Sequence, residues 1–173
     1  MIEDRLTKCL DDYPDFPKKG ILFKDILPVL QDVELFKELS NKLSKIDMVI
    51  GVEALIGIDA RGFIFGTAVA LLSGKPFLTA RKQGKLPGEL ICSSYDLEYG
   101  QNTLCIQKKA IQRYSSFCII DDLLATGGTA SAVESLLIDQ RKSVTGLCVI
   151  VELTGLLGRS KMKCEVASEL KYD

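Results

Sequence analysis

The sequence contains no histidine. This absence excludes Ser-His-Asp and Cys-His nucleophilic machinery and any zinc site with histidine ligands, because each of these requires an imidazole. If the chain is an enzyme, its acid–base chemistry depends on Asp, Glu, Lys or Tyr side chains, or on the substrate itself.

Long apolar runs are also missing. No run approaches the roughly 20 residues that span a bilayer. The N-terminal stretch MIEDRLTKCLDD is charged and lacks the apolar core of a signal peptide. We therefore expect a cytoplasmic protein that makes no contact with a membrane.

Neither sign of charge dominates the chain. The 22 basic residues nearly balance the 23 acidic ones, which leaves a net charge of −1. No global field then attracts nucleic acid or an anionic surface, and we expect neither as a partner. Any ability to bind an anion must come from a local site.

The six cysteines are scattered, and no two of them have the spacing of a metal site or a redox motif. They are Cys9, Cys92, Cys105, Cys118, Cys148 and Cys164. We expect reduced thiols, as in a cytosolic protein, that serve as small, partly apolar packing residues.

The length and composition favour one globular domain over residues 1–173. Hydrophobic residues make up 47% of the chain and charged residues 26%, which is the balance of an ordinary folded protein. No repeat, low-complexity stretch or linker divides the sequence.

Apolar segments of two alternating kinds predict the fold. Strands are expected at Ala54–Ile58, Phe77–Thr79, Phe117–Ile120 and Val144–Val151, and helices at Val33–Lys45, Gly62–Leu72 and Thr129–Gln140. This alternation is typical of an α/β fold with a parallel-sheet core flanked by helices. Such sheets bind ligands beyond the carboxyl ends of their strands.

Two segments depart from this alternation. Residues 1–30 combine a short polar helix with a loop interrupted by three prolines, and we expect them to form a small hood. Residues Ile91 to Ile106 alternate between polar and apolar, which suggests a hairpin or a mobile flap.

The strongest chemical signal lies in residues 117–137, FCIIDDLLATGGTASAVESLL. A buried strand is followed by a turn of small residues and then by a helix. The turn residues present several backbone N–H groups at the start of the helix, where glycine allows close approach and the helix dipole favours an anion. We predict that they bind a phosphate; they are Ala125, Thr126, Gly127, Gly128 and Thr129.

Two adjacent carboxylates, Asp121 and Asp122, come directly before this turn. Carboxylates accept hydrogen bonds from ribose hydroxyls and attract a magnesium shell. A phosphate cradle beside two such carboxylates predicts a site for a ribose 5-phosphate.

The motif DDLLATGGT resembles the binding signature for phosphoribosyl pyrophosphate (PRPP) of the type I phosphoribosyltransferases, in the form found in adenine phosphoribosyltransferases. The resemblance extends over nearly the whole chain. It includes DFPKKGILFKDILPVL from Asp15, GIDARGFIFG from Gly57, RKQGKLPGE from Arg81, SYDLEYG from Ser94 and VELTGLLGR from Val151. It implies the type I phosphoribosyltransferase fold and transfer of a phosphoribosyl group from PRPP to adenine, with Mg²⁺ carried by PRPP and Asp121 and Asp122 in its outer shell.

The segment GIDARGF places Asp59, Ala60 and Arg61 in a tight turn before a helix. An arginine fork suits the oxygens of a pyrophosphate. The resemblance assigns these residues to the pyrophosphate loop and implies a cis peptide bond between Asp59 and Ala60.

The basic segment ARKQGKLPG offers further cations for the leaving pyrophosphate, namely Arg81, Lys82 and Lys85. The resemblance implies that some of them reach across the interface of a homodimer. We expect a homodimer from this and from the small, apolar helix after Arg61.

The flap motif SYDLEYG contains Glu98 and Tyr99. Attack by a purine on the ribose requires a proton to leave the base, and a carboxylate can accept it. Because histidine is absent, Glu98 is the candidate, and the resemblance puts the catalytic carboxylate there. Tyr99 either closes over the ribose or the pyrophosphate, which would make it a pyrophosphate-binding residue, or packs against the hood.

Position 125 favours adenine as the base. Enzymes of this family that use 6-oxopurines usually carry a carboxylate where this chain has Ala125. The resemblance puts the adenine pocket at the backbone of Leu22 and Lys24, with Leu153 as an apolar wall. Lys24 departs from the arginine that is usual in the family, which leaves the role of its side chain open.

Three alternatives remain. The chain could use another base, such as xanthine, guanine or orotate, but Ala125 and the flap motif argue against this. It could be a PRPP-sensing regulator, yet no residues remain for a DNA-binding module. It could also bind nucleotide only to assemble, which the presence of Glu98 and Arg61 disfavours.

Overall fold

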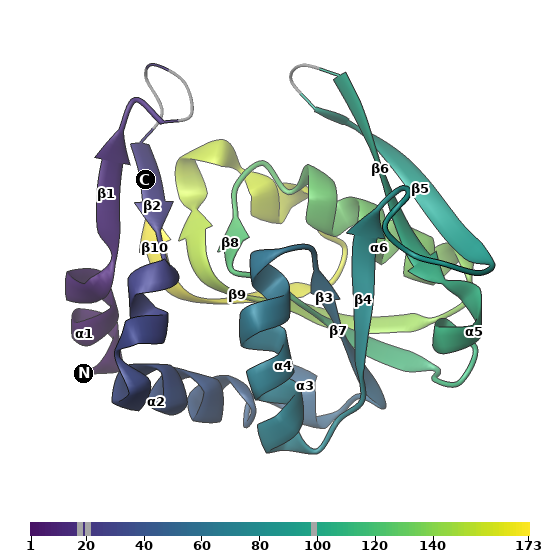
Figure 1. Cartoon of the computed structure of the whole chain (residues 1–173), viewed down its shortest axis with the longest axis horizontal. Helices are drawn as coiled ribbons and strands as arrows, with labels where there is room; N and C mark the ends of the chain where they lie inside the picture. The colour runs from purple at the N-terminus through teal and green to yellow at the C-terminus, as the bar shows by residue number, and fades with distance from the viewer. Residues whose placement is uncertain (17–18, 20–21, 98–99) are drawn as a thin grey trace.

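The computed structural model describes residues 1–16, 19, 22–97 and 100–173 (Figure 1). An eight-stranded sheet has the order β10-β9-β7-β3-β4-β6-β5, and β8 pairs with β9 beside this path. The strands are β3 (Ala54–Ile58), β4 (Phe77–Lys82), β5 (Leu90–Leu97), β6 (Gly100–Gln107), β7 (Ser116–Ile120), β8 (Leu123–Leu124), β9 (Ser143–Leu153) and β10 (Glu165–Tyr172). The predicted parallel core is confirmed, because β10, β9, β7, β3 and β4 run parallel.

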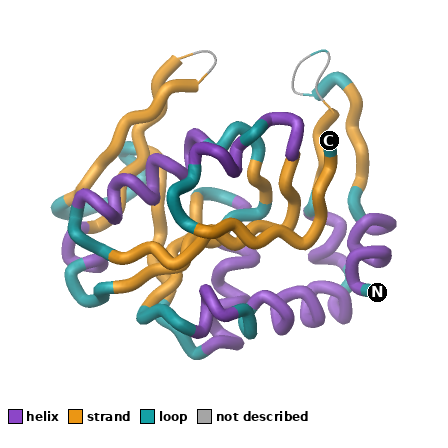
Figure 2. Tube along the Cα trace, turned by 180° about the vertical axis from the view of Figure 1, so that it is seen from behind, coloured by secondary structure: helices purple, strands orange, loops and turns teal. Residues whose placement is uncertain are grey.

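Helices cover both faces of this sheet (Figures 1 and 2). One face carries α1 (Ile2–Cys9), α2 (Val33–Leu43), α3 (Asp47–Ile50) and α4 (Arg61–Ser73), and the other carries α6 (Gly128–Asp139). The short helix α5 (Lys108–Ile111) follows β6. In the part of the chain that the structure describes, no helix is long and apolar enough to cross a membrane.

Strand β7 shows why the apolar run predicted a buried strand. Phe117 and Ile119 pack into the core under α6, whereas Cys118 and Ile120 pack into the core under α2 and α4. All four side chains are fully buried. A strand that is covered on both faces needs apolar residues at consecutive positions, and each large side chain buried here contributes about 1.5–3 kcal/mol.

The predicted hood contains more structure than expected. The polar helix α1 is confirmed, but the loop after it contains an antiparallel pair of strands, β1 (Asp11–Pro14) and β2 (Leu22–Asp25), followed by the 3-10 helix η1 (Leu27–Gln31). The prolines in this segment argued against strands, so the pair was not predicted. Pro14 is nevertheless compatible with a strand, because it occupies the last position of an edge strand, where proline is tolerated.

The structure extends one predicted strand and adds another. Strand β4 continues beyond the predicted Phe77–Thr79 to Lys82, so that Arg81 and Lys82 belong to a strand. Strand β10 was not predicted at all. Among the described strands it pairs with β9 alone, at the sheet edge, and it exposes part of each face, so its sequence lacks the apolar run of a central strand.

The expectation of reduced cysteines was wrong for one pair. Cys92 and Cys105 form a disulfide across the predicted hairpin, which the structure builds from β5 and β6. The two residues are 13 positions apart in sequence but face each other in the antiparallel register, with their Cα atoms 4.1 Å apart. The other four cysteines are free.

Candidate active site

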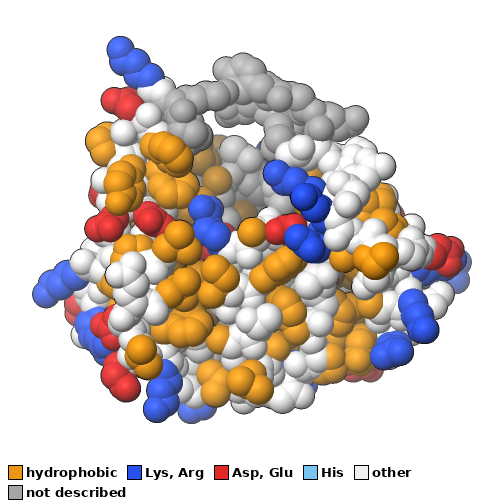
Figure 3. Space-filling model, in the orientation of Figure 1, with side chains coloured by type: hydrophobic (Ala, Val, Ile, Leu, Met, Phe, Trp, Pro, Cys, Tyr) orange, Lys and Arg blue, Asp and Glu red, His pale blue; other side chains and the backbone are white. Residues whose placement is uncertain are grey.

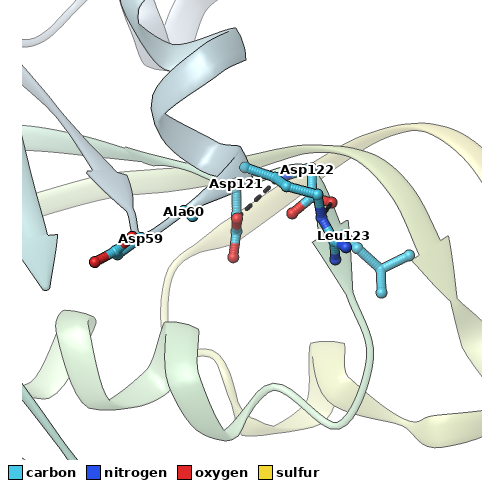
Figure 4. A pocket seen from close by; sticks show the side chains of 6 residues that line it. Asp59, Ala60, Asp121, Asp122 and Leu123 are labelled. Carbon is cyan, nitrogen blue, oxygen red and sulfur yellow. Dashed lines mark hydrogen bonds and ion pairs between the residues drawn. The ribbon is translucent and has the colours of Figure 1, made fainter. Parts of the chain in front are cut away.

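A pocket of about 280 Å³ lies where two neighbouring parallel strands, β3 and β7, end (Figure 4). It is lined by Asp59, Ala60, Arg61, Asp121, Asp122 and Leu123. The chain leaves β3 into α4 on one face and leaves β7 toward α6 on the other, so the pocket occupies a topological switch point. Ligands bind at such points in open α/β sheets.

The first loop of the pocket has the predicted backbone. The peptide bond between Asp59 and Ala60 is cis, as the resemblance implied. Arg61 opens α4, and its Nε lies 2.5 Å from Oδ2 of Asp122 on the second loop. The sequence placed these two side chains in separate motifs, and the structure brings them together in one pocket.

The second loop holds its two carboxylates differently. Asp122 is buried and paired with Arg61, whereas Asp121 accepts the backbone N–H of Asp122 at 2.9 Å. Burial, and then the neighbouring charge of Asp122, raise the pKa of Asp121 well above its usual value. Gly62 makes room for this carboxylate, because a Cβ at that position would lie 2.8 Å from Oδ1 of Asp121.

The predicted phosphate loop lines a second pocket of about 100 Å³, which adjoins the first at Asp121 and Leu123. Gly127 has a left-handed φ of 75° and precedes α6, whose backbone N–H groups at Gly128 and Thr129 belong to the first turn. N–H groups of a first turn have no carbonyl partner within their helix and are free to face an anion. All five predicted phosphate-binding residues line this pocket.

The three basic residues of segment 80–88 that were predicted to bind pyrophosphate lie at different distances from the first pocket. Arg81 donates from Nε to Oδ2 of Asp59 at 2.9 Å, so it borders the first pocket. Its Nη1 donates to the backbone oxygen of Lys85 at 3.4 Å. The side chains of Lys82 and Lys85 are exposed, and neither residue lines the pocket.

Two of the three predicted adenine-binding residues, Lys24 and Leu153, are linked through Tyr172. The ammonium of Lys24 on β2 lies 2.7 Å from Asp12 and 4.2 Å from the ring centroid of Tyr172. Tyr172 on β10 is in register with Leu153 at the end of β9, so the hood strand and the predicted apolar wall share a neighbour. Leu22 is half exposed.

Some residues of the site were missed by sequence reasoning. Leu123 lines both pockets, and the ring of Phe23 lies 5.4 Å from the guanidinium carbon of Arg61, which ties the hood to the pocket. The hydroxyl of Thr129 bonds to that of Tyr95 on the flap strand β5 at 3.3 Å. The position of Phe23 between Leu22 and Lys24 was a usable signal. The catalytic candidate Glu98 and its neighbour Tyr99 lie outside the described residues.

Known proteins with the same sequence pattern and fold were found, although no family model matches the chain. An adenine phosphoribosyltransferase of Prochlorococcus marinus (strain MIT 9215) is 55% identical over 99% of this chain and 100% of its own length. The solved adenine phosphoribosyltransferase of Rhodothermus marinus has a TM-score of 0.91 and 36% identity, over 99% of this chain and 98% of its own.

The adenine phosphoribosyltransferase of Saccharomyces cerevisiae was solved with adenine and D-2,5-dideoxy-2,5-imino-altritol 1,6-bisphosphate. It has a TM-score of 0.89 and 36% identity over 98% of each chain. Sequence and fold agree over nearly the whole chain, which confirms the type I phosphoribosyltransferase fold. The chain belongs to the adenine phosphoribosyltransferase family.

Proposed function

We propose that the chain transfers the 5-phosphoribosyl group of PRPP to N9 of adenine and thereby forms AMP and pyrophosphate, a purine salvage reaction. The observation that best supports this function is that the two pockets adjoin each other and are both lined by Asp121. One is lined by backbone N–H groups at a helix start, and the other by two carboxylates and an arginine. This arrangement matches a sugar that carries a phosphate at one end and a pyrophosphate at the other.

The 5′-phosphate binds in the loop from Ala125 to Thr129, where a helix start supplies donors and a favourable dipole. Asp121 and Asp122 accept hydrogen bonds from the ribose hydroxyls. Arg61 bonds to Asp122 through Nε, and its planar guanidinium presents further N–H donors for the pyrophosphate. Arg81, held on Asp59, supplies a second cation at the same end.

The residues present fit a magnesium ion that arrives with PRPP. Asp121 and Asp122 are hard oxygen donors in the pocket. Among the residues that the structure describes, no cluster of three acidic or cysteine side chains forms a metal cage of its own. Magnesium is usually held by one or two carboxylates together with substrate phosphates, and it would stabilise the charge that develops on the departing pyrophosphate.

During transfer, N9 of adenine forms a bond to C1′ of the ribose as the bond from C1′ to pyrophosphate breaks. The electron pair leaves with pyrophosphate, and a proton leaves the base at N7. We assign this proton to the carboxylate of Glu98, because the chain contains no histidine. Tyr99 is proposed to close over the ribose and pyrophosphate.

We further propose a homodimer. Helix α4 exposes Ile64, Leu71 and Leu72, which are spaced to lie on one face, and Leu71 is 83% exposed. Hydrophobic side chains gather over the face of the molecule that carries α4 (Figure 3). A large exposed apolar patch is typical of an interface between proteins. Lys82 and Lys85, exposed near the pocket, are the candidates to reach the partner's site.

The proposed location is the cytoplasm, because PRPP is multiply charged and does not diffuse across membranes. The Cys92–Cys105 disulfide is unusual for that compartment, where thiols are kept reduced.

Product formation from PRPP and magnesium tests the proposed function, with adenine, hypoxanthine, guanine and orotate assayed in parallel. We expect adenine alone to be consumed, with AMP and pyrophosphate in equal amounts. Consumption of another base would contradict the argument from Ala125. If no base reacts, the chain is not a transferase, and binding of PRPP without turnover would favour the regulator or the nucleotide-binding subunit.

The Glu98→Gln variant tests the assignment of the proton acceptor. It is expected to bind AMP as the unaltered chain does but to lose turnover. Asp96→Asn, a neutralised carboxylate two residues earlier in the chain, is the matched control and should retain turnover. Full turnover in Glu98→Gln would place the proton acceptor elsewhere.

A further inference from the structure

The backbone of Gly158 lies directly against the phosphate loop. A Cβ on Gly158 would lie 2.1 Å from the backbone oxygen of Ala125 and 2.9 Å from the nitrogen of Gly127. In the other direction, a Cβ on Gly127 would lie 2.5 Å from the backbone oxygen of Gly158. The two backbones touch without room for a side chain, so the position of Gly158 limits the shape of the loop from Ala125 to Gly127.

The next residue, Arg159, is fixed to the two strands at the edge of the sheet. Its Nε and Nη2 donate to the two carboxylate oxygens of Glu152 on β9 at 2.8 and 2.5 Å. Its Nη1 donates to the backbone oxygen of Val166 on β10 at 2.7 Å. Glu152 is only 3% exposed and also accepts the hydroxyl of Ser168 at 2.7 Å. Because the guanidinium of Arg159 is bonded to both β9 and β10, the backbone of Arg159 and of its neighbour Gly158 has little freedom to move.

Glu152 is also the strand partner of the residue that precedes the phosphate loop. Leu124, the residue before Ala125, is in register with Glu152 in the pairing of β8 with β9. The ion pair of Glu152 and Arg159 is therefore connected to the phosphate loop at two points. Glu152 is connected to the start of the loop through the pairing of β8 with β9. Arg159 is connected to it through Gly158, its neighbour in the 3-10 helix η3 (Gly158–Lys161).

A second buried carboxylate, that of Glu134, connects α6 to the segment after Arg159. Glu134 on α6 is 1% exposed and accepts the backbone N–H groups of Lys163 and Cys164 at 3.0 and 2.6 Å. Because α6 begins at Gly128, the helix that supplies the phosphate donors is tied to the far end of the segment that carries Gly158. We call residues 158–164 the brace.

We propose that Arg159 is a positioning residue of the 5′-phosphate site, acting through Gly158 to hold the loop from Ala125 to Gly128 in its binding shape. The inference rests on the proposed function, since it assumes that this loop binds the 5′-phosphate. Arg159 itself is not proposed to touch the ligand.

Affinity for AMP and for adenosine, measured by calorimetry on the full chain, separates positioning from general stability. The two ligands differ only in the 5′-phosphate. In Arg159→Met we expect AMP affinity to fall about tenfold or more while adenosine affinity stays within about twofold. In the transferase assay the KM for PRPP rises by a similar factor, and the KM for adenine does not change.

Two further variants test the same inference if Arg159→Met folds poorly. Arg159→Lys retains the charge but cannot reproduce the fork, and it is expected to lose AMP affinity as well. Gly158→Ala pushes on Ala125 and Gly127 while Arg159 remains in place, and it should give the same loss confined to AMP. Lys161→Met, which removes an exposed cation of the brace, is the matched control and should bind AMP normally.

A folded Arg159→Met or Gly158→Ala variant that binds AMP as tightly as the unaltered chain would overturn the inference. So would an equal loss of affinity for AMP and adenosine, because that is the result of general loosening. If the unaltered chain itself binds AMP no better than adenosine, the assignment of the phosphate loop fails instead, and the proposed function fails with it.

Discussion

Arg61 and Asp122 face each other across the pocket, with Nε of the guanidinium 2.5 Å from Oδ2 of the carboxylate. They come from the loops after two neighbouring strands, β3 and β7. The Asp122 side chain is 7% exposed and that of Arg61 is 35% exposed, so the carboxylate is the partner that depends on the contact. One ion pair therefore joins the candidate pyrophosphate end of the pocket to the candidate ribose end.

Replacing Arg61 with Met is expected to lower kcat/KM for PRPP by about 100-fold or more, as when a donor to developing charge is removed from other enzymes. Because the change leaves the buried carboxylate of Asp122 without its cation, the free energy of unfolding should also fall, by about 1–3 kcal/mol. Steady-state kinetics and urea unfolding measure the two effects. Arg141→Met, a change at an exposed arginine on the α6–β9 turn, is the control. Unchanged kinetics in Arg61→Met would remove Arg61 from the site.

Lys24 is expected to act on the base and not on PRPP. Its ammonium bridges Asp12 of the hood and the ring of Tyr172, and such a cation–ring contact is worth about 0.5–2 kcal/mol depending on solvation. Lys24→Met should raise the KM for adenine several-fold and leave the KM for PRPP unchanged. Asp12→Asn, which weakens the same contact from the other side, should show a smaller shift in the same direction. A change confined to the KM for PRPP would contradict this role.

Thiol counting tests the disulfide. Alkylation of the unfolded chain without reductant should modify four cysteines, and alkylation after reduction should modify six. Because the bond joins residues 13 positions apart in the sequence, its reduction is expected to cost about 3 kcal/mol in free energy of unfolding. Cys92→Ser should show the same loss, whereas Cys9→Ser should not. Six modified cysteines before reduction would show that the bond does not form.

The stability of the brace should depend on pH through Glu152. Hydrogen bonds from Arg159 hold the pKa of Glu152 below its usual value of about 4.3. A carboxylate with a lowered pKa in the folded state stabilises the protein above its unfolded pKa and loses this contribution as the pH falls through the folded pKa. Urea unfolding should therefore show the largest difference between the unaltered chain and Arg159→Met above about pH 5, narrowing below about pH 4. A difference that does not change with pH would contradict a charged pair.

The central part of the fold could be predicted because its strands are covered on both faces. Phe117 to Ile120 had to be apolar at every position, and this left a pattern that could be read from the sequence. The edges left weaker patterns. Strand β10 exposes part of each face, and β1 and β2 lie in a segment rich in proline, so neither produced a periodic signal.

The candidate site was predictable where one short segment supplies it, as in the phosphate loop and the pair Asp121 and Asp122. Contacts between distant segments were not. Nothing in the local sequence indicates that Arg159 bonds to Glu152 and Val166, since the chain must turn through η2 (Thr154–Leu156) and η3 before they meet. The disulfide, however, could have been predicted from the sequence. A hairpin from Ile91 to Ile106 pairs residues whose numbers sum to 197, and 92 and 105 satisfy this rule.

The pairing of β9 with β10 has a consequence for synthesis on the ribosome. The hood, both pocket loops and α6 emerge before Arg159, and Arg159 emerges before Val166 and Ser168, to which it bonds. A nascent chain that stops short of β10 therefore contains every residue proposed to touch PRPP but lacks the strand that anchors the brace. If the brace shapes the phosphate loop as proposed, capture of PRPP must wait until β10 has been synthesised and paired with β9.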